Sequence, residues 1–319
     1  MKELAAELRK YKQVFVVCDR NVEGFAREVT GLRTGGRSGE PGGLLAITAD
    51  EAHKTIDTVM QICRWLLEMG ADRDALVLAV GGGVTTDMAG FAASIYKRGI
   101  RYANVPTTLL SMVDAGIGGK TGVNLDGFKN LLGVIRQPEF TAIFPEALQT
   151  LPEREFRSGL AEMLKTFIIK NPSHAYERTV AEGPLPELIQ LAAGIKQEIV
   201  EKDEFESGVR RKLNLGHTWG HAIEWRFPGA YSHGEAVAIG MVQAARYAER
   251  FGIAEEEGLA ARIGKDLKAC GLPTELPCPV SELLPAIAKD KKAQNGQIRL
   301  VLPVRIGKVV VKKVDPSTL

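Results

Sequence analysis

The fold class of this 319-residue chain is decided by one stretch, Ala75-Leu76-Val77-Leu78-Ala79-Val80-Gly81-Gly82-Gly83-Val84-Thr85-Thr86-Asp87. Its six leading apolar residues are typical of a strand buried on both faces of a parallel sheet. The glycines then turn the chain into a helical pattern that continues through Ser94, so backbone N–H groups could approach a pyrophosphate with no Cβ in the way. The stretch matches neither GxGxxG nor a Walker A loop, and a plain tight turn is the alternative. Asp87 is either part of such a site or an ordinary acid of a helix N-terminus.

Further strands and helices extend this pattern along the chain. Residues 14–18 form an apolar run that ends at Asp19-Arg20-Asn21, residues 52–69 have helical periodicity, and residues 101–105 form a short strand. From residue 151 the chain is mostly helical, with helices predicted at 152–170, 185–203, 209–225, 235–251 and 255–270 and strands at 297–303 and 308–311. We therefore predict an α/β nucleotide-binding (Rossmann-like) domain at 1–150 and a mainly α-helical domain at 151–319, with a ligand in the cleft between them.

The composition argues against several classes of protein. Lys and Arg number 41 against 39 Asp and Glu, so the bulk charge favours neither a nucleic acid nor an acidic membrane as partner. Four scattered cysteines are too few for a disulfide framework, and no apolar run is long enough to cross a bilayer. The first ten residues read as a charged amphipathic helix rather than a signal peptide. We expect a cytoplasmic protein.

Three of the five histidines lie close together in the sequence. His217 and His221 are four residues apart and share one face of the predicted helix, and His233 follows after a turn. Imidazole is a common ligand of divalent metals, so the cluster predicts a metal site, for which the spacing alone pairs His217 with His221. The alternative is that one or two of them are ordinary helix-surface or capping residues.

Basic and polar residues suggest anion binding in several places. Glycines surround Lys120, and Lys129 and Asn130 repeat this chemistry nearby, which favours an anion site over a glycine-rich surface hairpin. Glu162 and Lys165 lie three apart among small and apolar residues, which indicates a buried pair rather than an exposed one. More such groups are contributed by Lys196, Arg210, Asn214, Lys291 and Lys292. Together they predict a small, polyanionic, hydroxylated substrate.

Taken in order along the chain, these motifs resemble the 3-dehydroquinate synthase family, sugar-phosphate cyclases of the shikimate pathway of aromatic amino-acid biosynthesis. The resemblance covers most of the chain and rests on Asp19-Arg20-Asn21-Val22, Glu51-Ala52-His53-Lys54, Gly81-Gly82-Gly83-Val84, Asp87-Met88-Ala89-Gly90-Phe91, Lys97-Arg98-Gly99-Ile100, Val105-Pro106-Thr107-Thr108, Gly118-Gly119-Lys120-Thr121-Gly122-Val123-Asn124, Lys129-Asn130, Gly159-Leu160-Ala161-Glu162, Asn214-Leu215-Gly216-His217-Thr218, His233-Gly234-Glu235 and Asp290-Lys291-Lys292. It implies a dehydroquinate synthase-like fold and a homodimer.

The resemblance also implies the cofactors. A divalent metal, Zn²⁺ in most members with Co²⁺ possible, would be held by Glu162, His217 and His233, which leaves His221 as a contact of the substrate phosphate. NAD⁺ would be held by Asp19, Asn21, Glu51, Lys54, Gly83, Val84, Thr85, Thr86, Asp87, Thr107, Thr108, Lys120, Lys129, Leu148 and Thr150. The chain departs from the family pattern at Ala49-Asp50-Glu51 and at Thr85-Thr86. The second departure either shifts the cofactor or lets the Thr86 hydroxyl donate to phosphate.

The activity implied is conversion of 3-deoxy-D-arabino-heptulosonate 7-phosphate to 3-dehydroquinate and phosphate, a carbon–oxygen lyase reaction. NAD⁺ oxidises the C5 hydroxyl, phosphate leaves by β-elimination, the ketone is reduced, and an intramolecular aldol step closes the ring. Lys165 and Asp114 would hold hydroxyl groups, and Arg210 with Lys196 would bind the carboxylate, which suits a guanidinium fork. The phosphate would be contacted by Lys120, Asn130, Asn214, His221, Lys291 or Lys292, and Arg98 from a neighbouring subunit.

Three alternatives stay open. A sister cyclase acting on sedoheptulose 7-phosphate or glucose 6-phosphate would need no carboxylate-binding group, so Arg210 together with Asn214 and His221 argues against it. A metal-dependent polyol dehydrogenase would lack the paired anion sites and would produce net NADH. A binding module without catalysis is the weakest of the three, because all the expected ionisable residues are present.

Overall fold

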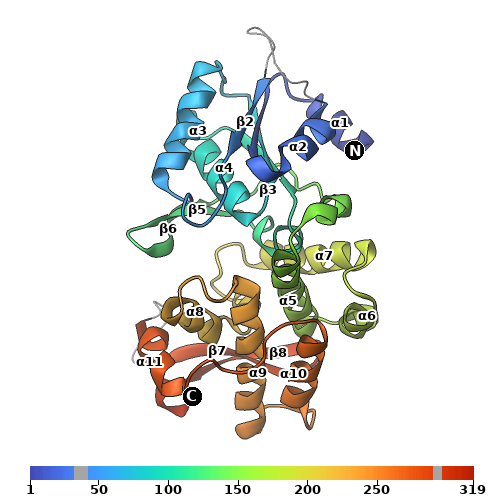
Figure 1. Cartoon of the computed structure of the whole chain (residues 1–319), viewed down its shortest axis with the longest axis vertical. Coiled ribbons are helices and arrows are strands. Elements are labelled where there is room, and N and C mark those ends of the chain that lie inside the picture. The colour runs from blue at the N-terminus through green and yellow to red at the C-terminus, as the bar shows by residue number, and fades with distance from the viewer. Residues whose placement is uncertain (32–41, 290–296) are drawn as a thin grey trace. The chain divides into compact units, whose positions relative to one another are not determined.

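The computed structural model describes residues 1–31, 42–289 and 297–319 (Figure 1). The chain forms two compact units, Met1–Leu151 and Pro152–Leu319. No helix in the described ranges is both long and apolar enough to cross a membrane.

The first unit is built on a four-stranded parallel sheet in the order β2-β1-β3-β4. Its strands are β1 (Val14–Asp19), β2 (Gly42–Ile47), β3 (Leu76–Gly81) and β4 (Arg101–Pro106), and its helices are α1 (Lys2–Leu8), α2 (Glu23–Thr30), α3 (Ile56–Glu68) and α4 (Gly83–Ile95). Every residue of β3 is buried, which explains its unbroken apolar sequence. The predicted strands at 14–18, 75–80 and 101–105 are confirmed, and so is the Rossmann-like fold class.

Alternate side chains of the strands pack on opposite faces of this sheet. Phe15 and Val17 of β1 point into the cluster formed with α3 and α4, whereas Val16 and Cys18 point into the cluster formed with α1 and α2. Figure 1 shows the two pairs of helices on either side of the sheet. The carboxyl ends of the strands lead into the loops and turns that carry the polar motifs.

A glycine-rich hairpin follows the sheet. β5 (Lys120–Leu125) and β6 (Phe128–Ile135) pair antiparallel, with Gly122 opposite Gly133. A Cβ on either glycine would overlap the backbone of the other strand. A glycine-rich hairpin, the alternative that the sequence disfavoured, therefore forms here, because the two strands can pair this closely only with glycine at both positions. Lys120 and Lys129 are exposed on it, and their anion-binding role stays a prediction.

The second unit is mostly helical, which confirms the predicted class. It contains α5 (Glu153–Ile169), α6 (Ala175–Glu182), α7 (Pro186–Lys202), α8 (His217–Arg226), α9 (His233–Arg250), α10 (Leu259–Ala269), α11 (Val280–Lys289) and the antiparallel pair β7 (Ile298–Arg305) and β8 (Lys308–Val314). The short helical turns of the first unit are η1 (Arg20–Val22), η2 (Tyr96–Arg98), η3 (Ser111–Ala115) and η4 (Pro145–Thr150), and those of the second unit are η5 (Pro172–His174), η6 (Val209–Asn214) and η7 (Pro316–Thr318).

The single helix predicted over residues 209–225 is wrong. η6 and α8 are separated at Gly216, whose φ of 79° is in the left-handed region. A Cβ on Gly216 would lie 2.7 Å from the carbonyl oxygen of Val237 in α9, so the glycine also allows α8 to pack closely on α9. His217 is consequently the first residue of α8 rather than a mid-helix residue.

Candidate active site

Three side chains from three helices of the second unit converge on one point. Glu162 lies in the middle of α5, and His217 and His233 are the first residues of α8 and α9. Nε2 of His217 lies 3.8 Å and Nε2 of His233 lies 3.5 Å from Oε1 of Glu162. One ligand atom from each residue falls within 4.8 Å of the others. The structure thus brings together the carboxylate and two imidazoles that the resemblance selected.

The second ring nitrogen, Nδ1, of each histidine also contacts an oxygen atom. Nδ1 of His217 lies 3.1 Å from the carbonyl oxygen of Leu215, and Nδ1 of His233 lies 3.3 Å from Oε2 of Glu224. Such contacts fix the tautomer that leaves Nε2 directed at a metal. Glu224 was not predicted as a site residue. The available signal was its position seven residues after His217, two turns along the same helix face.

Charges in this cluster are strongly coupled. Burial opposes ionisation of Glu162, but Lys165 and His233 outweigh it and lower the pKa of Glu162 to about 2. Burial, together with the charges of Lys165 and His233, lowers the pKa of His217 well below its usual value. For His233 burial acts in the same direction, but contacts with Glu162 and Glu224 raise its pKa to about 10. Glu162 is therefore ionised, His217 is neutral, and His233 carries a proton.

The residues fit a divalent metal of the zinc type. Both carboxylate oxygens of Glu162 are buried; Oε2 forms an ion pair with Lys165, whereas Oε1 has no hydrogen bond and faces the Nε2 atoms of both histidines. A buried carboxylate of this kind is costly unless a cation or donor completes it. Two imidazole nitrogens and one carboxylate oxygen also match the donor set of catalytic zinc sites, which keep a coordination position open.

His221 lies beside this cluster. Its ring centroid is 5.2 Å from that of His217 and 6.2 Å from that of His233. It also forms a second group of possible metal ligands with Glu224 and His233. The predicted neighbourhood of His217 and His221 on one helix is therefore confirmed, but among the described residues neither group of possible ligands contains both rings, so the pairing that spacing alone gave is not supported.

The proposed anion-binding residues of the second unit are mostly buried. Lys165, Lys196 and Arg210 are 1%, 7% and 2% exposed. Arg210 donates to the carbonyl oxygen of Glu204, and Asn214 donates to Glu206. A cation that is shielded from bulk water attracts an anion more strongly than an exposed one does, so these side chains are suited to bind a substrate anion.

In the first unit, the glycines at the start of α4 have an intramolecular role. A Cβ on Gly83 would lie 2.8 Å from Cβ of Ala115, and a Cβ on Gly82 would lie 3.0 Å from Cγ2 of Thr108. A Cβ on Gly81 would overlap Thr85. The absence of a Cβ at these positions is therefore needed for packing within the protein, and the approach of a ligand to the backbone N–H groups stays a prediction. The N-terminus of α4 keeps its backbone donors.

Thr86, at which the chain departs from the family pattern, also makes its contact within the protein. Its hydroxyl donates to the carbonyl oxygen of Gly83 at 3.0 Å, and the residue is 2% exposed. The suggested donation from this hydroxyl to phosphate is not what the structure has, because a local helix contact already uses the hydroxyl hydrogen.

A polar network connects α4 with the hairpin. Nζ of Lys54 donates to Oδ2 of Asp87 at 2.6 Å and to Oδ1 of Asn130. The backbone N–H of Asn130 donates to Asn124, which in turn donates to Glu51 at 2.8 Å. Asp87 is therefore the ion-pair partner of Lys54 rather than an ordinary acid of a helix N-terminus. Asn124 belongs to the same network, although the sequence predicted no role for it.

Three of the remaining predicted residues make local hydrogen bonds. Asp19 accepts from the backbone N–H of Asn21 and caps η1, the N–H of the buried Thr107 donates to Gly81, and Thr108 accepts from the N–H of Ser111. The others are given by their place in the fold: Asp114 in η3, Val84 in the first turn of α4, Leu148 and Thr150 in η4, and Arg98, exposed with φ of 68°, at the end of η2. Lys291 and Lys292 lie outside the described residues.

Comparisons with known proteins agree with this geometry. The family model for the 3-dehydroquinate synthase N-terminal region matches residues 44–158, and that for the C-terminal region matches residues 159–293. A 3-dehydroquinate synthase from Acidithiobacillus ferrooxidans is 42% identical over 317 residues, which cover 96% of this chain and 86% of the relative.

Two solved structures are similar over nearly the whole chain. A 2-epi-5-epi-valiolone synthase from Streptomyces hygroscopicus subsp. jinggangensis, with NAD⁺ and Zn²⁺ bound, has a TM-score of 0.87 at 30% identity and covers 98% of this chain and 90% of its own. A 2-deoxy-scyllo-inosose synthase with carbaglucose-6-phosphate, NAD⁺ and Co²⁺ has a TM-score of 0.86 at 25% identity, covering 99% and 92%. With family models matching both halves of the sequence, this chain belongs to the 3-dehydroquinate synthase family.

Proposed function

We propose that this protein converts 3-deoxy-D-arabino-heptulosonate 7-phosphate to 3-dehydroquinate and phosphate, as a phosphate-eliminating carbon–oxygen lyase of aromatic amino-acid biosynthesis. The observation that carries the proposal is the buried Glu162 carboxylate, 3.8 and 3.5 Å from the Nε2 atoms of His217 and His233, in a chain 42% identical to a 3-dehydroquinate synthase. This donor set suits a catalytic zinc, and the relatives with NAD⁺ and a divalent ion support the same cofactors here.

Glu162, His217 and His233 would hold the metal, and the first unit would hold NAD⁺ around the N-terminus of α4. When bound, the ion supplies a Lewis acid for a substrate hydroxyl and NAD⁺ supplies a reversible hydride acceptor. The ion pair of Lys165 with Glu162 keeps the Lys165 ammonium beside the metal ligands, where its Nζ protons can orient a hydroxyl group. Low exposure of Lys165 and Glu162, at 1% and 0%, excludes water from this contact.

The substrate carboxylate would be bound by Arg210 with Lys196. Both are buried, and the Arg210 guanidinium is oriented by the carbonyl oxygen of Glu204. A preoriented guanidinium binds a carboxylate with two parallel hydrogen bonds. This favours a sugar acid over the carboxylate-free substrates of a sister cyclase. Asp114, Lys120, Asn130, Arg98, Asn214 and His221 keep the substrate roles proposed from the resemblance.

The decisive test is a substrate comparison with purified protein, NAD⁺ and Zn²⁺. The heptulosonate phosphate should release phosphate and yield 3-dehydroquinate with no net change in NADH absorbance. Turnover of sedoheptulose 7-phosphate or glucose 6-phosphate in its place would establish a sister cyclase. Net NADH formation from a simple polyol would establish a dehydrogenase.

We also propose a cytoplasmic homodimer. All four cysteines are in the described residues and none forms a disulfide, which suits a reducing compartment. On β6, Phe128, Leu131 and Val134 are 65%, 41% and 38% exposed, and a second copy could cover apolar side chains of this strand. Light scattering with the Phe128→Asp variant tests the dimer, since the substitution should shift the mass toward that of a monomer if β6 lies in the interface.

A further inference from the structure

The first turn of α9, which begins with His233, is attached to α5 at three successive levels. α5 presents Arg154, Ser158 and Glu162 at intervals of four residues, so all three lie on one helix face. They contact Glu235, Gly234 and His233 in turn. The position of the His233 ring relative to Glu162 is therefore set by how α9 is seated on α5.

The middle level is a close backbone contact. The N–H of Gly234 donates to Oγ of Ser158 at 2.9 Å, and a Cβ on Gly234 would overlap the backbone of Ser158. No side chain of α9 separates the two helices here, so a small rotation of α9 would displace His233.

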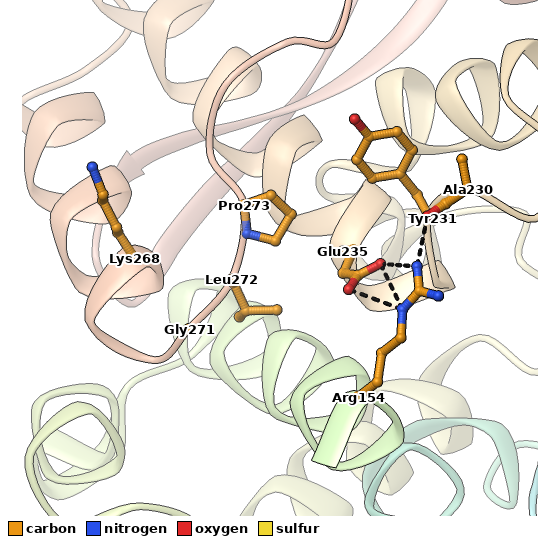
Figure 2. Close-up of a pocket in the computed structure, with 8 residues that line it drawn as sticks. All are labelled: Arg154, Ala230, Tyr231, Glu235, Lys268, Gly271, Leu272 and Pro273. Carbon is orange, nitrogen blue, oxygen red and sulfur yellow. Dashed lines mark hydrogen bonds and ion pairs between the residues drawn. The ribbon is translucent and has the colours of Figure 1, made fainter. Parts of the chain in front are cut away.

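The outer level is a two-pronged ion pair (Figure 2). Nε of Arg154 lies 3.1 and 3.2 Å from the two carboxylate oxygens of Glu235, and Nη2 lies 2.7 Å from Oε2. Nη2 also donates to the carbonyl oxygen of Ala230 at 2.6 Å, in the turn before α9. The same Oε2 of Glu235 accepts from the N–H of Ser232 at 2.7 Å and completes a capping box. Arg154 thus holds both the turn and the cap that orient the first residue of α9.

The pair lines a surface pocket of 550 Å³ together with Tyr231 and Lys268, and the Arg154 side chain is 52% exposed. An exposed ion pair adds little to the free energy of unfolding. We therefore assign the bidentate contact between Arg154 and Glu235 a role in orienting the first turn of α9.

We propose that Arg154 is a positioning residue of the metal site: its two-pronged contact with Glu235 seats the first turn of α9 on α5 and so holds the His233 ring against Glu162. This inference rests on the proposed metal site. It does not depend on which substrate is turned over.

The test measures metal affinity of the apoprotein by competition with a chromophoric chelator, using Zn²⁺ alone. Arg154→Ala and Glu235→Gln should each raise the Zn²⁺ Kd about tenfold, the lower end of the usual effect of ligand-orienting partners. Glu235→Gln keeps a residue that can close the capping box, so it carries the test if Arg154→Ala does not fold. In the double variant the loss should not exceed that of the larger single variant, because both remove one contact.

Arg157→Ala is the matched control, since Arg157 pairs with Glu153 on the same helix and should leave the Zn²⁺ Kd within about twofold. Visible spectra of the Co²⁺-loaded proteins should change for Arg154→Ala and not for the control. A Zn²⁺ Kd within twofold of the parent protein in both Arg154→Ala and Glu235→Gln overturns the inference. Failure of the parent protein to bind Zn²⁺ overturns the proposed function instead.

Discussion

Oε2 of Glu224 lies 3.3 Å from Nδ1 of His233, while Nε2 of the same ring lies 3.5 Å from Oε1 of Glu162. One imidazole is thus held between two carboxylates, one on the metal side and one behind it. The arrangement orients the ring and makes it more basic, both of which strengthen a metal bond once the proton is displaced.

Replacing Glu224, whose carboxylate contacts Nδ1 of His233, should weaken metal binding. Glu224→Gln is expected to raise the Zn²⁺ Kd about 10-fold, and Glu224→Ala up to about 100-fold, because His233 loses its charged partner. Chelator competition on the apoprotein measures both values. Glu282→Gln, which loses only the exposed pair with Arg226, is the control and should leave the Kd unchanged. Equal affinity in Glu224→Ala and the parent protein would show that Glu224 does not act on the site.

Metal binding should release a proton from His233. The raised pKa means that this ring is protonated in the metal-free protein at neutral pH, whereas His217, with a lowered pKa, is already neutral. A metal must displace the proton, so affinity increases as pH rises, and about one proton per ion should be released near pH 7.5. Calorimetry in buffers of different ionisation enthalpy counts the protons. In Glu224→Gln the count should fall, and a count of zero in the parent protein would contradict the assigned protonation.

The packing of Gly83 on Ala115 should be testable through stability. Gly83→Ala is expected to lower the free energy of unfolding by about 1–3 kcal/mol, because the new Cβ would lie 2.8 Å from that of Ala115. Ala115→Gly in the same chain should recover most of this loss. Gly24→Ala in α2 is the control: its Cβ would meet nothing within 4 Å, and a gain of up to about 1 kcal/mol is expected. Urea denaturation measures all four proteins; no recovery in the double variant would rule out this contact as the cause.

Lys54 should contribute to the stability of the first unit through a buried pair. The side chains of Lys54 and Asp87 are 6% and 19% exposed, and Lys54→Met removes the ammonium that donates to Asp87 and Asn130. We expect a loss of about 3–5 kcal/mol in the free energy of unfolding. Lys10→Met breaks a pair with Glu7 whose side chains are 66% and 34% exposed, and should cost less than about 1 kcal/mol. Similar losses in the two variants would mean that burial does not strengthen the Lys54 pair.

The elements that the sequence predicted are those with strong local signals. β1 and β3 are continuous apolar runs, and β4 is a short strand that is buried after its first residue; their positions were predicted to within about a residue. β2 was missed because it begins with two glycines and is only partly buried. α11 was missed because Pro285 lies inside it, and proline normally argues against a helix.

The division of residues 209–225 into η6 and α8 shows where periodicity misleads. The apolar spacing is continuous across Leu213 and Leu215, but Gly216 turns the chain because α9 approaches too closely for a Cβ. The reason for the break is thus a contact with Val237, twenty-one positions later in the sequence.

The fold class, the family and the residue types of the metal cluster could all be assigned from the amino-acid sequence alone. These depend on local periodicity, on glycine positions and on motifs that occur in a fixed order. The folded structure was needed to show that Glu224 supports His233, that Thr86 and the glycines leading into α4 contact the protein itself, and that Arg154 contacts Glu235, 81 positions away. Contacts of this kind depend on how packed helices meet, and the distance and orientation at which they meet are set by the whole core rather than by neighbouring residues.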